Sequence, residues 1–263
     1  MRRRSFIAAL GGVAAWPLAV HAQQGDRVRA LQVRMPLKAE AVAAMIGQFI
    51  RGIEAQVGWT TQGTREQRYL DGPRLLRQVP AITELSLLDA TGHEQLRISR
   101  LAKDVVERQT DYSQDPKFTE ANAHKVYYGP VYFPRPVGPH DPGEPYMTLS
   151  VASTRPDVGV SVIEIRLKQV QDTVAGIKVG ERGVAYVLDP QRRVIAHPDI
   201  NLITADFSGL AQVQVARAVG SAAQPQSLQV VKDINGHEVL AAYAFVTPVG
   251  WLVFVELPVE EAQ

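Results

Sequence analysis

The chain has 263 residues, of which 46% are hydrophobic, 7% aromatic and 21% charged. This composition is typical of a globular protein and excludes a disordered, collagenous or coiled-coil chain. The 28 Lys and Arg residues nearly balance the 27 Asp and Glu residues, so the net charge gives no electrostatic basis for a nucleic-acid partner. The sequence has no Cys, which excludes disulfides, thiol catalysis and cysteine-ligated zinc.

The first 22 residues resemble an export signal. Arg3 and Arg4 precede the apolar run 6–20, and the small residues Val20 and Ala22 occupy the −3 and −1 positions of a cleavage site. The order Arg-Arg-x-Phe-Ile is similar to a twin-arginine signal. The apolar run is shorter than the ~20 residues that span a bilayer, so we expect cleavage after Ala22 and a periplasmic location. An uncut membrane anchor is the alternative.

A long helix is expected over 26–57, within an N-terminal segment 23–59. Apolar residues recur there at helical spacing, for example Val42, Ile46 and Ile53. Pro36 predicts either a kink or the first turn of this helix. A second, shorter helix is expected over 66–78.

From residue 82 onward the pattern predicts two strand-rich units. Turn signals lie at 89–92 and at Asn235-Gly236, and Asp115-Pro116 predicts a helix start. The strands are expected over 82–89, 94–99, 126–133, 146–152, 158–165, 183–189, 193–197, 228–233, 237–245 and 251–256, and helices over 168–175 and 210–219. The two units share a strand–turn–strand start, which predicts an α+β protein with two mainly antiparallel modules in series.

Three groups of segments resemble the double Cache domain, a tandem PAS-like sensing module of bacterial histidine kinases, chemoreceptors and nucleotide cyclases. They are 129–133 (GPVYF) with 144–150 (EPYMTLS), 180–189 (GERGVAYVLD) with 194–199 (VIAHPD), and 250–256 (GWLVFVE). The resemblance implies that the long helix packs along both modules. It also implies that a membrane-distal module, 60–160, holds a small ligand and that a membrane-proximal module, 161–258, relays the signal.

The resemblance has further implications for partners. Related domains often form homodimers along the long helix, and they continue into a membrane span and an effector that are missing from this chain. We therefore expect either a freestanding sensor or a remnant of a receptor. The stretch Lys125-Val-Tyr-Tyr-Gly-Pro lacks the tryptophan of the amino-acid-binding subset, and Pro130 replaces the arginine of the carboxylate-binding pattern. The resemblance therefore assigns neither an amino acid nor a carboxylate to this chain as its ligand.

Strand alternation selects candidate ligand-binding residues. Over 146–152, Met147 and Leu149 share the face expected to pack on the long helix, which leaves the opposite, polar face to line a cavity. Tyr128 and Tyr132 share a parity and are expected in that same cavity, and Arg135 is suited to pairing with a carboxylate. The alternative is that these residues are ordinary strand and loop positions. The candidate set is Tyr128, Tyr132, Arg135, Tyr146, Thr148 and Ser150.

No motif in the sequence predicts catalysis, a metal site or a cofactor. The six histidines lack the spacing of a helical zinc site, and there is no Gly-x-Ser-x-Gly elbow, P-loop or dinucleotide fingerprint. His197 is interpreted as a turn cap. We therefore expect a non-enzymatic sensor of a small metabolite. The alternatives are a periplasmic solute-binding protein of a transport system, which would require parallel sheets, and an exported enzyme with an unrecognised site.

Overall fold

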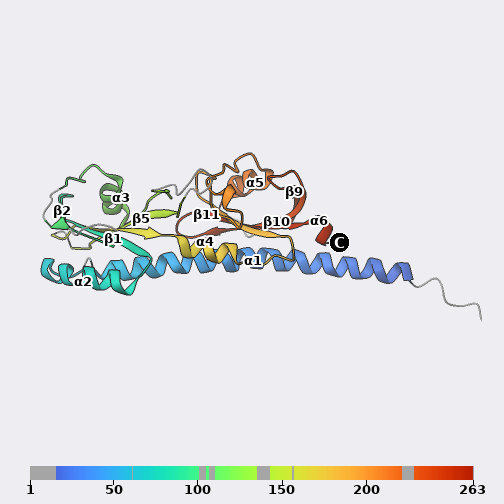
Figure 1. The fold of residues 1–263 in the computed structure, drawn as a ribbon, viewed down its shortest axis with the longest axis horizontal. Helices are drawn as coiled ribbons and strands as arrows, with labels where there is room; N and C mark the ends of the chain where they lie inside the picture. Colours follow the sequence, from blue (N-terminus) through green and yellow to red (C-terminus); the bar gives the residue numbers. More distant parts are fainter. Residues whose placement is uncertain are drawn as a thin grey trace, which may run out of the picture.

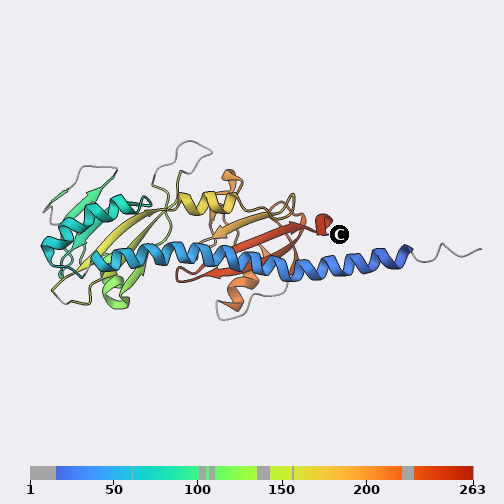
Figure 2. The same ribbon diagram turned by 90° about the horizontal axis from the view of Figure 1, so that it is seen from below.

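The computed structural model describes residues 16–60, 62–100, 105–106, 110–134, 143–155, 157–220 and 228–262. One long helix, α1, runs beneath two sheets that follow each other along its length (Figure 1). Helices α1 (Trp16–Thr60), α2 (Arg65–Gln78) and α4 (Lys168–Ala175) cover one face of the sheets, whereas α3 (Pro116–His124) and α5 (Ala211–Val219) lie on the other face (Figures 1 and 2). The expected arrangement of a long helix packed along two modules is confirmed.

Helix α1 extends over Trp16–Thr60. It therefore begins before the expected 26–57 and includes part of the segment interpreted as an export signal, whose cleavage remains a prediction. Pro36 lies well inside α1, so the expectation that it marks the first turn is wrong. The helix buries one stripe against the sheets, including Ile46 and Ile50. Within the described ranges, no helix combines the length and apolarity that a membrane span requires.

Helix α2, Arg65–Gln78, starts at a capping box in which the Thr64 side chain accepts from the backbone of Gln67 and the Gln67 side chain accepts from the backbone of Thr64. These reciprocal bonds satisfy two N–H groups that have no partner within the helix. The helix packs against α1 and against the first strand, β1. It thus closes the end of the core beneath the first sheet.

The first sheet has the order β3-β2-β1-β6-β5-β4, counting the strands in the described part of the chain. Its strands are β1 (Ile82–Leu88), β2 (Glu94–Ser99), β3 (Val105–Val106), β4 (Val126–Tyr128), β5 (Tyr146–Ala152) and β6 (Val160–Arg166). Helix α3, Pro116–His124, starts at the predicted Asp115 cap. Because β6 pairs with both β1 and β5, the expected module boundary after residue 160 cuts through this sheet, which ends at Arg166.

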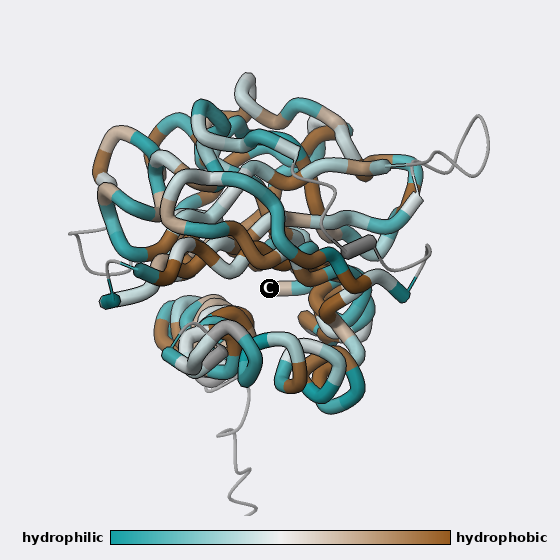
Figure 3. The backbone as a smooth tube through the Cα atoms, turned by 90° about the vertical axis from the view of Figure 1, so that its left-hand side faces the viewer, coloured by the Kyte–Doolittle hydropathy of each residue, from teal (hydrophilic) through white to brown (hydrophobic). Residues whose placement is uncertain are grey.

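The two faces of the first sheet carry different cores. Leu85, Met147, Leu149 and Ile163 belong to the large cluster shared with α1, as the strand alternation predicts for Met147 and Leu149. The opposite face packs Leu88, Val160 and Val162 against Phe118 and Ala121 of α3. Figure 3 shows the hydrophobic residues gathered between the helices and the sheets.

The second sheet has the order β8-β7-β11-β10-β9 over the residues that the structure describes. Helix α4 (Lys168–Ala175) leads into it, and the other elements are β7 (Val184–Leu188), β8 (Val194–Ala196), the short 3-10 helix η1 (Ile200–Leu202), α5 (Ala211–Val219), β9 (Gln229–Lys232), β10 (Glu238–Val246), β11 (Trp251–Pro258) and α6 (Val259–Ala262). Its strands β10 and β11 rest on α1. An aromatic cluster of Tyr186, Phe207 and Phe254 fills its other face.

Every strand ladder among the described residues is antiparallel. This confirms the predicted α+β class with antiparallel sheets and argues against the solute-binding alternative, which required parallel sheets. One strand is shorter than expected, because β4 ends at Tyr128 where the predicted strand continues to residue 133. Gly129 and Pro130 follow directly, and proline has no N–H to donate to a ladder.

Candidate ligand site at the junction of the two sheets

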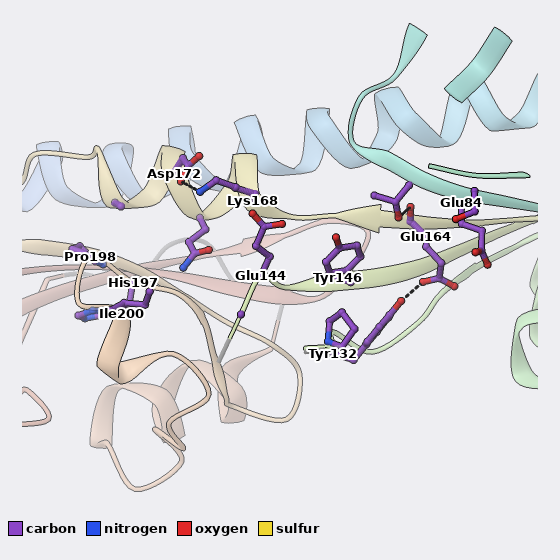
Figure 4. A pocket seen from close by; sticks show the side chains of 16 residues that line it. Glu84, Tyr132, Glu144, Tyr146, Glu164, Lys168, Asp172, His197, Pro198 and Ile200 are labelled. Atoms are coloured by element: carbon purple, nitrogen blue, oxygen red, sulfur yellow. Dashed lines mark hydrogen bonds and ion pairs between the residues drawn. The ribbon is translucent and has the colours of Figure 1, made fainter. Parts of the chain in front are cut away.

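A cavity of about 990 Å³ lies where the two sheets meet. Figure 4 shows it from close by. The first sheet and its loops contribute Thr83, Glu84, Ser99, Tyr132, Pro134, Gly143, Glu144, Tyr146 and Glu164. The second half of the chain contributes Lys168, Gln171, Asp172 and Ala175 of α4 with His197, Pro198 and Ile200. The volume is within the range of small-molecule sites.

Two tyrosines form an aromatic wall. Tyr132 pairs with Tyr146 through two backbone hydrogen bonds of 2.9 and 2.8 Å. Their ring centroids are 6.1 Å apart and the ring planes are tilted by 37°. The backbone pairing therefore fixes both rings at one side of the cavity.

Glu164 on β6 is the centre of the polar contacts in the cavity. Its carboxylate accepts a 2.5 Å hydrogen bond from the Tyr132 hydroxyl and bonds of 2.9 and 3.1 Å from Thr148 Oγ1. Burial raises the pKa of the Glu164 carboxyl, and Glu84 acts in the same direction, while these hydrogen bonds and Lys117 oppose the rise. Burial also raises the pKa of Tyr132, to which the bond with Glu164 adds.

Glu84 on β1 stands directly opposite Glu164 in the register of β1 and β6. Both side chains extend from the sheet toward the same side, next to each other (Figure 4). The pair therefore places two carboxylates side by side on one wall of the cavity.

The charged groups toward the second sheet form their own pairs. Arg166 lies 3.5 Å from the Glu144 carboxylate, and Lys168 lies 3.1 Å from that of Asp172 one turn along α4. Burial lowers the pKa of His197, and its Nδ1 accepts a 2.8 Å bond from the backbone N–H of Asp199. This local turn agrees with the interpretation of His197 as a cap.

The structure brings some of the predicted site residues together and separates others. Tyr132 and Tyr146 line the cavity. Thr148 does not line it but donates a hydrogen bond to Glu164, which does. Ser150 is fully buried on the same face of β5 but is not part of the lining. Arg135 lies outside the described residues.

Tyr128 does not join Tyr132. Its hydroxyl donates a 2.5 Å hydrogen bond to Glu54 of α1, and the residue packs against the core shared with α1. The expectation that the two tyrosines line one cavity does not hold, because the ladder ends at Tyr128 and the parity argument fails across Gly129-Pro130. Burial raises the pKa of Tyr128, and the bond to Glu54 adds to this rise.

Sequence reasoning missed Glu84 and Glu164. A signal was present in each case, because Glu84 follows Ile82-Thr83 in an apolar strand and Glu164 lies between Ile163 and Ile165. A charged residue inside such a strand is unusual unless it has a partner or a function. In the part of the chain that the structure describes, no group of three or more His, Asp and Glu side chains is arranged to hold a metal ion.

Solved structures with the same fold include the extracellular domain of a protein assigned as a histidine kinase and the ligand-binding domains of chemoreceptors. The extracellular domain of mmHK1S-Z2, a protein assigned as a histidine kinase, has a TM-score of 0.69 at 16% identity and covers 86% of this chain and 97% of its own. The ligand-binding domain of the Pseudomonas aeruginosa PAO1 amino acid chemoreceptor PctC, in complex with GABA, has a TM-score of 0.59 at 16% identity. It covers 83% of this chain and 96% of its own. The ligand-binding domain of the Pseudomonas fluorescens chemoreceptor CtaA, in complex with L-isoleucine, has a TM-score of 0.61 at 16% identity. It covers 93% of this chain and 97% of its own.

No curated protein sequence matches the chain. The sequence profile of the Cache domain, in its double form, matches residues 29–263. This match takes in α1 from residue 29 together with both sheets, in agreement with the fold. The chain therefore belongs to the Cache domain family.

Proposed function

We propose that this Cache domain senses a small metabolite outside the cytoplasm and that the metabolite binds in the cavity at the junction of the two sheets, without chemical turnover. The observation that carries the proposal is the composition of the cavity wall. Aromatic rings and a few converging polar groups line a space of about 990 Å³, which is the usual make-up of a small-molecule site. Chemoreceptor domains that share the fold were solved with GABA and L-isoleucine bound.

The position of the cavity supports a route for the signal. Its wall comes from both halves of the chain, because α4 and the segment around His197 face the first sheet across it. Helix α4 packs on β7 and β8, and Arg193 donates a 2.8 Å bond to the carbonyl of Val131. A ligand that prefers one arrangement of these parts shifts the population toward it. We assign the first sheet to the membrane-distal module and the second to the membrane-proximal one.

A homodimer along α1 is part of this proposal. The side of α1 away from the sheets exposes Val33, Leu37 and Met45, which are 60%, 56% and 44% exposed. Apolar side chains on the outer face of a helix are suited to a partner helix. Sedimentation of the full chain is expected to show a dimer that Leu37→Glu weakens and Val230→Glu, on exposed β9, leaves intact. A chain that is monomeric at all concentrations contradicts this part.

The test of the sensing proposal is a thermal-shift screen of the full chain against a broad panel of metabolites. A ligand at about one hundred times its Kd is expected to stabilise the fold by about 2.7 kcal/mol. The double variant Tyr132→Ala, Thr148→Ala is expected to weaken that ligand, and Val230→Ala on exposed β9 serves as the control. Absence of stabilisation by every compound contradicts the proposal, and unchanged affinity in the double variant places the site elsewhere.

A further inference from the structure

We propose that the ligand is an organic cation whose ammonium group is held between the carboxylates of Glu84 and Glu164 and against the rings of Tyr132 and Tyr146. This inference rests on the proposed function, because it names the chemical class that the same cavity takes. It differs from the zwitterionic amino acids bound in the chemoreceptor structures that share the fold.

The first step is the position of the two glutamates. Glu84 and Glu164 are direct partners across the β1–β6 ladder, both are half-buried, and both line the cavity. Like charges directly opposite each other destabilise a sheet. A sheet that keeps such a pair facing a cavity has a site for a positive charge between the two carboxylates.

The second step is that the basic side chains that the structure describes around the pair bond elsewhere. Arg97 bonds Glu94 at 3.1 Å, Lys117 lies 3.8 Å from Asp115, and Arg166 and Lys168 pair with Glu144 and Asp172. Arg97 and Lys117 act on Glu84 and Glu164 only through longer-range electrostatics.

Within the described residues, no ion pair reaches Glu84 or Glu164, and Glu164 accepts only from the neutral hydroxyls of Tyr132 and Thr148. Among the described side chains, the negative charge of the pair is thus not matched by a cation in direct contact. A metal ion is a poorer fit, because the described part of the chain offers no group of three ligands.

The third step is the aromatic wall. The tilted rings of Tyr132 and Tyr146 border the same cavity as the two carboxylates. Aromatic faces attract ammonium groups through the ring quadrupole. Rings and carboxylates together favour a cation that carries a hydrocarbon group. A bare metal ion has no such group.

The experiment uses four-carbon probes that differ only in their end groups. Calorimetry on the full chain compares 1,4-diaminobutane and n-butylamine with 4-aminobutyrate and succinate, and 2-phenylethylamine adds a ring. At least one of the three amines is expected to bind at least tenfold tighter than 4-aminobutyrate, with succinate showing no binding. Glu84→Gln and Glu164→Gln are each expected to weaken that amine at least tenfold, while Glu238→Gln, on an exposed residue of β10, leaves its affinity unchanged.

Several outcomes overturn the inference. Succinate or 4-aminobutyrate binding as tightly as the amines refutes the charge class but leaves the sensing cavity intact. Full amine affinity in both glutamine variants refutes the role of the pair. Binding of calcium alone, lost in both variants, assigns the pair to a metal ion. No binding by any probe refutes the organic cation, and the broad metabolite screen then decides the proposed function separately.

Discussion

The hydroxyl of Tyr132 donates a 2.5 Å hydrogen bond to the carboxylate of Glu164, which joins a loop after β4 to the centre of the first sheet. Thr148 adds two further contacts to the same carboxylate. These donors are neutral, so they orient the carboxylate without cancelling its charge. The charge of Glu164 is therefore held in a half-buried position next to a second carboxylate, that of Glu84.

This arrangement predicts a dependence of stability on pH. Since burial raises the pKa of Glu164 in the folded chain above its ordinary value of 4.5, the folded state holds the proton more tightly than the unfolded state does. The free energy of unfolding therefore falls as pH rises from the unfolded pKa through the folded pKa, and the loss is complete above the latter. Glu84, Lys117, Tyr132 and Thr148 are the groups that face it.

Glu164→Gln is expected to remove this dependence and to raise the free energy of unfolding at neutral pH. Denaturant unfolding of both proteins from about pH 4 to about pH 8 measures the difference, in which the other titrating groups largely cancel. The free energy of unfolding of the variant, relative to that of the parent, is expected to increase as pH rises. A difference that stays constant over this range contradicts the assignment.

Local sequence signals account for most of the elements. The predicted bounds of β2, β5 and α4 agree with the structure, because alternation, turn residues and the change to helical period lie within a few residues of each other. The cap at Asp115 is confirmed by its bond to the N–H of Lys117. The double Cache resemblance added the arrangement of the modules along α1.

The site was less accessible from the sequence because its key contacts join distant segments. Glu84 and Glu164 become neighbours only through the register of β1 against β6, which no local pattern specifies. Parity failed for Tyr128 because a break in the strand resets the alternation. Tyr146 and Thr148 were selected because β5 keeps a strict period of two, whereas Tyr132 was selected by its parity with Tyr128. The role of all three in binding remains a prediction.

The bond between Tyr128 and Glu54 predicts a structural role for this tyrosine. Tyr128→Phe keeps the ring but removes a bond to a charged group, so the free energy of unfolding is expected to fall by about 1.5–3 kcal/mol. Because the side chain lies toward α1, ligand affinity should not change. Denaturant unfolding and calorimetry on the same variant provide both values. A large loss of affinity with unchanged stability would return Tyr128 to the binding site.

Gly159 predicts a steric limit at the end of the first sheet. A Cβ at this position would lie 2.0 Å from the carbonyl oxygen of Asp89, so Gly159→Ala must displace backbone and is expected to lower the free energy of unfolding by about 2 kcal/mol or more. Gly52→Ala is the matched control, because a Cβ there meets nothing within 4 Å. Gly52→Ala, inside α1, is expected to raise the free energy of unfolding by about 1 kcal/mol. Equal effects of the two substitutions contradict the argument.

Arg193 connects the second sheet to the first. Its side chain pairs with the fully buried Asp189 at 2.7 Å and donates to the carbonyl of Val131 at 2.8 Å. Arg193→Ala leaves a buried carboxylate without its cation, so the free energy of unfolding is expected to fall by about 3 kcal/mol. Arg193→Lys keeps the charge but loses the forked geometry that serves both acceptors, so its effect should be intermediate.

The double variant Asp189→Asn, Arg193→Ala separates the lost charge pair from the lost link to Val131. Removing both charges eliminates the unpaired carboxylate, so part of the stability lost in Arg193→Ala should return. The bond to Val131 is missing from both variants. Hydrogen exchange of the backbone around Val131 should therefore be faster than in the parent in both. If the double variant is as unstable as Arg193→Ala alone, the unpaired carboxylate of Asp189 is not the cause of the lost stability.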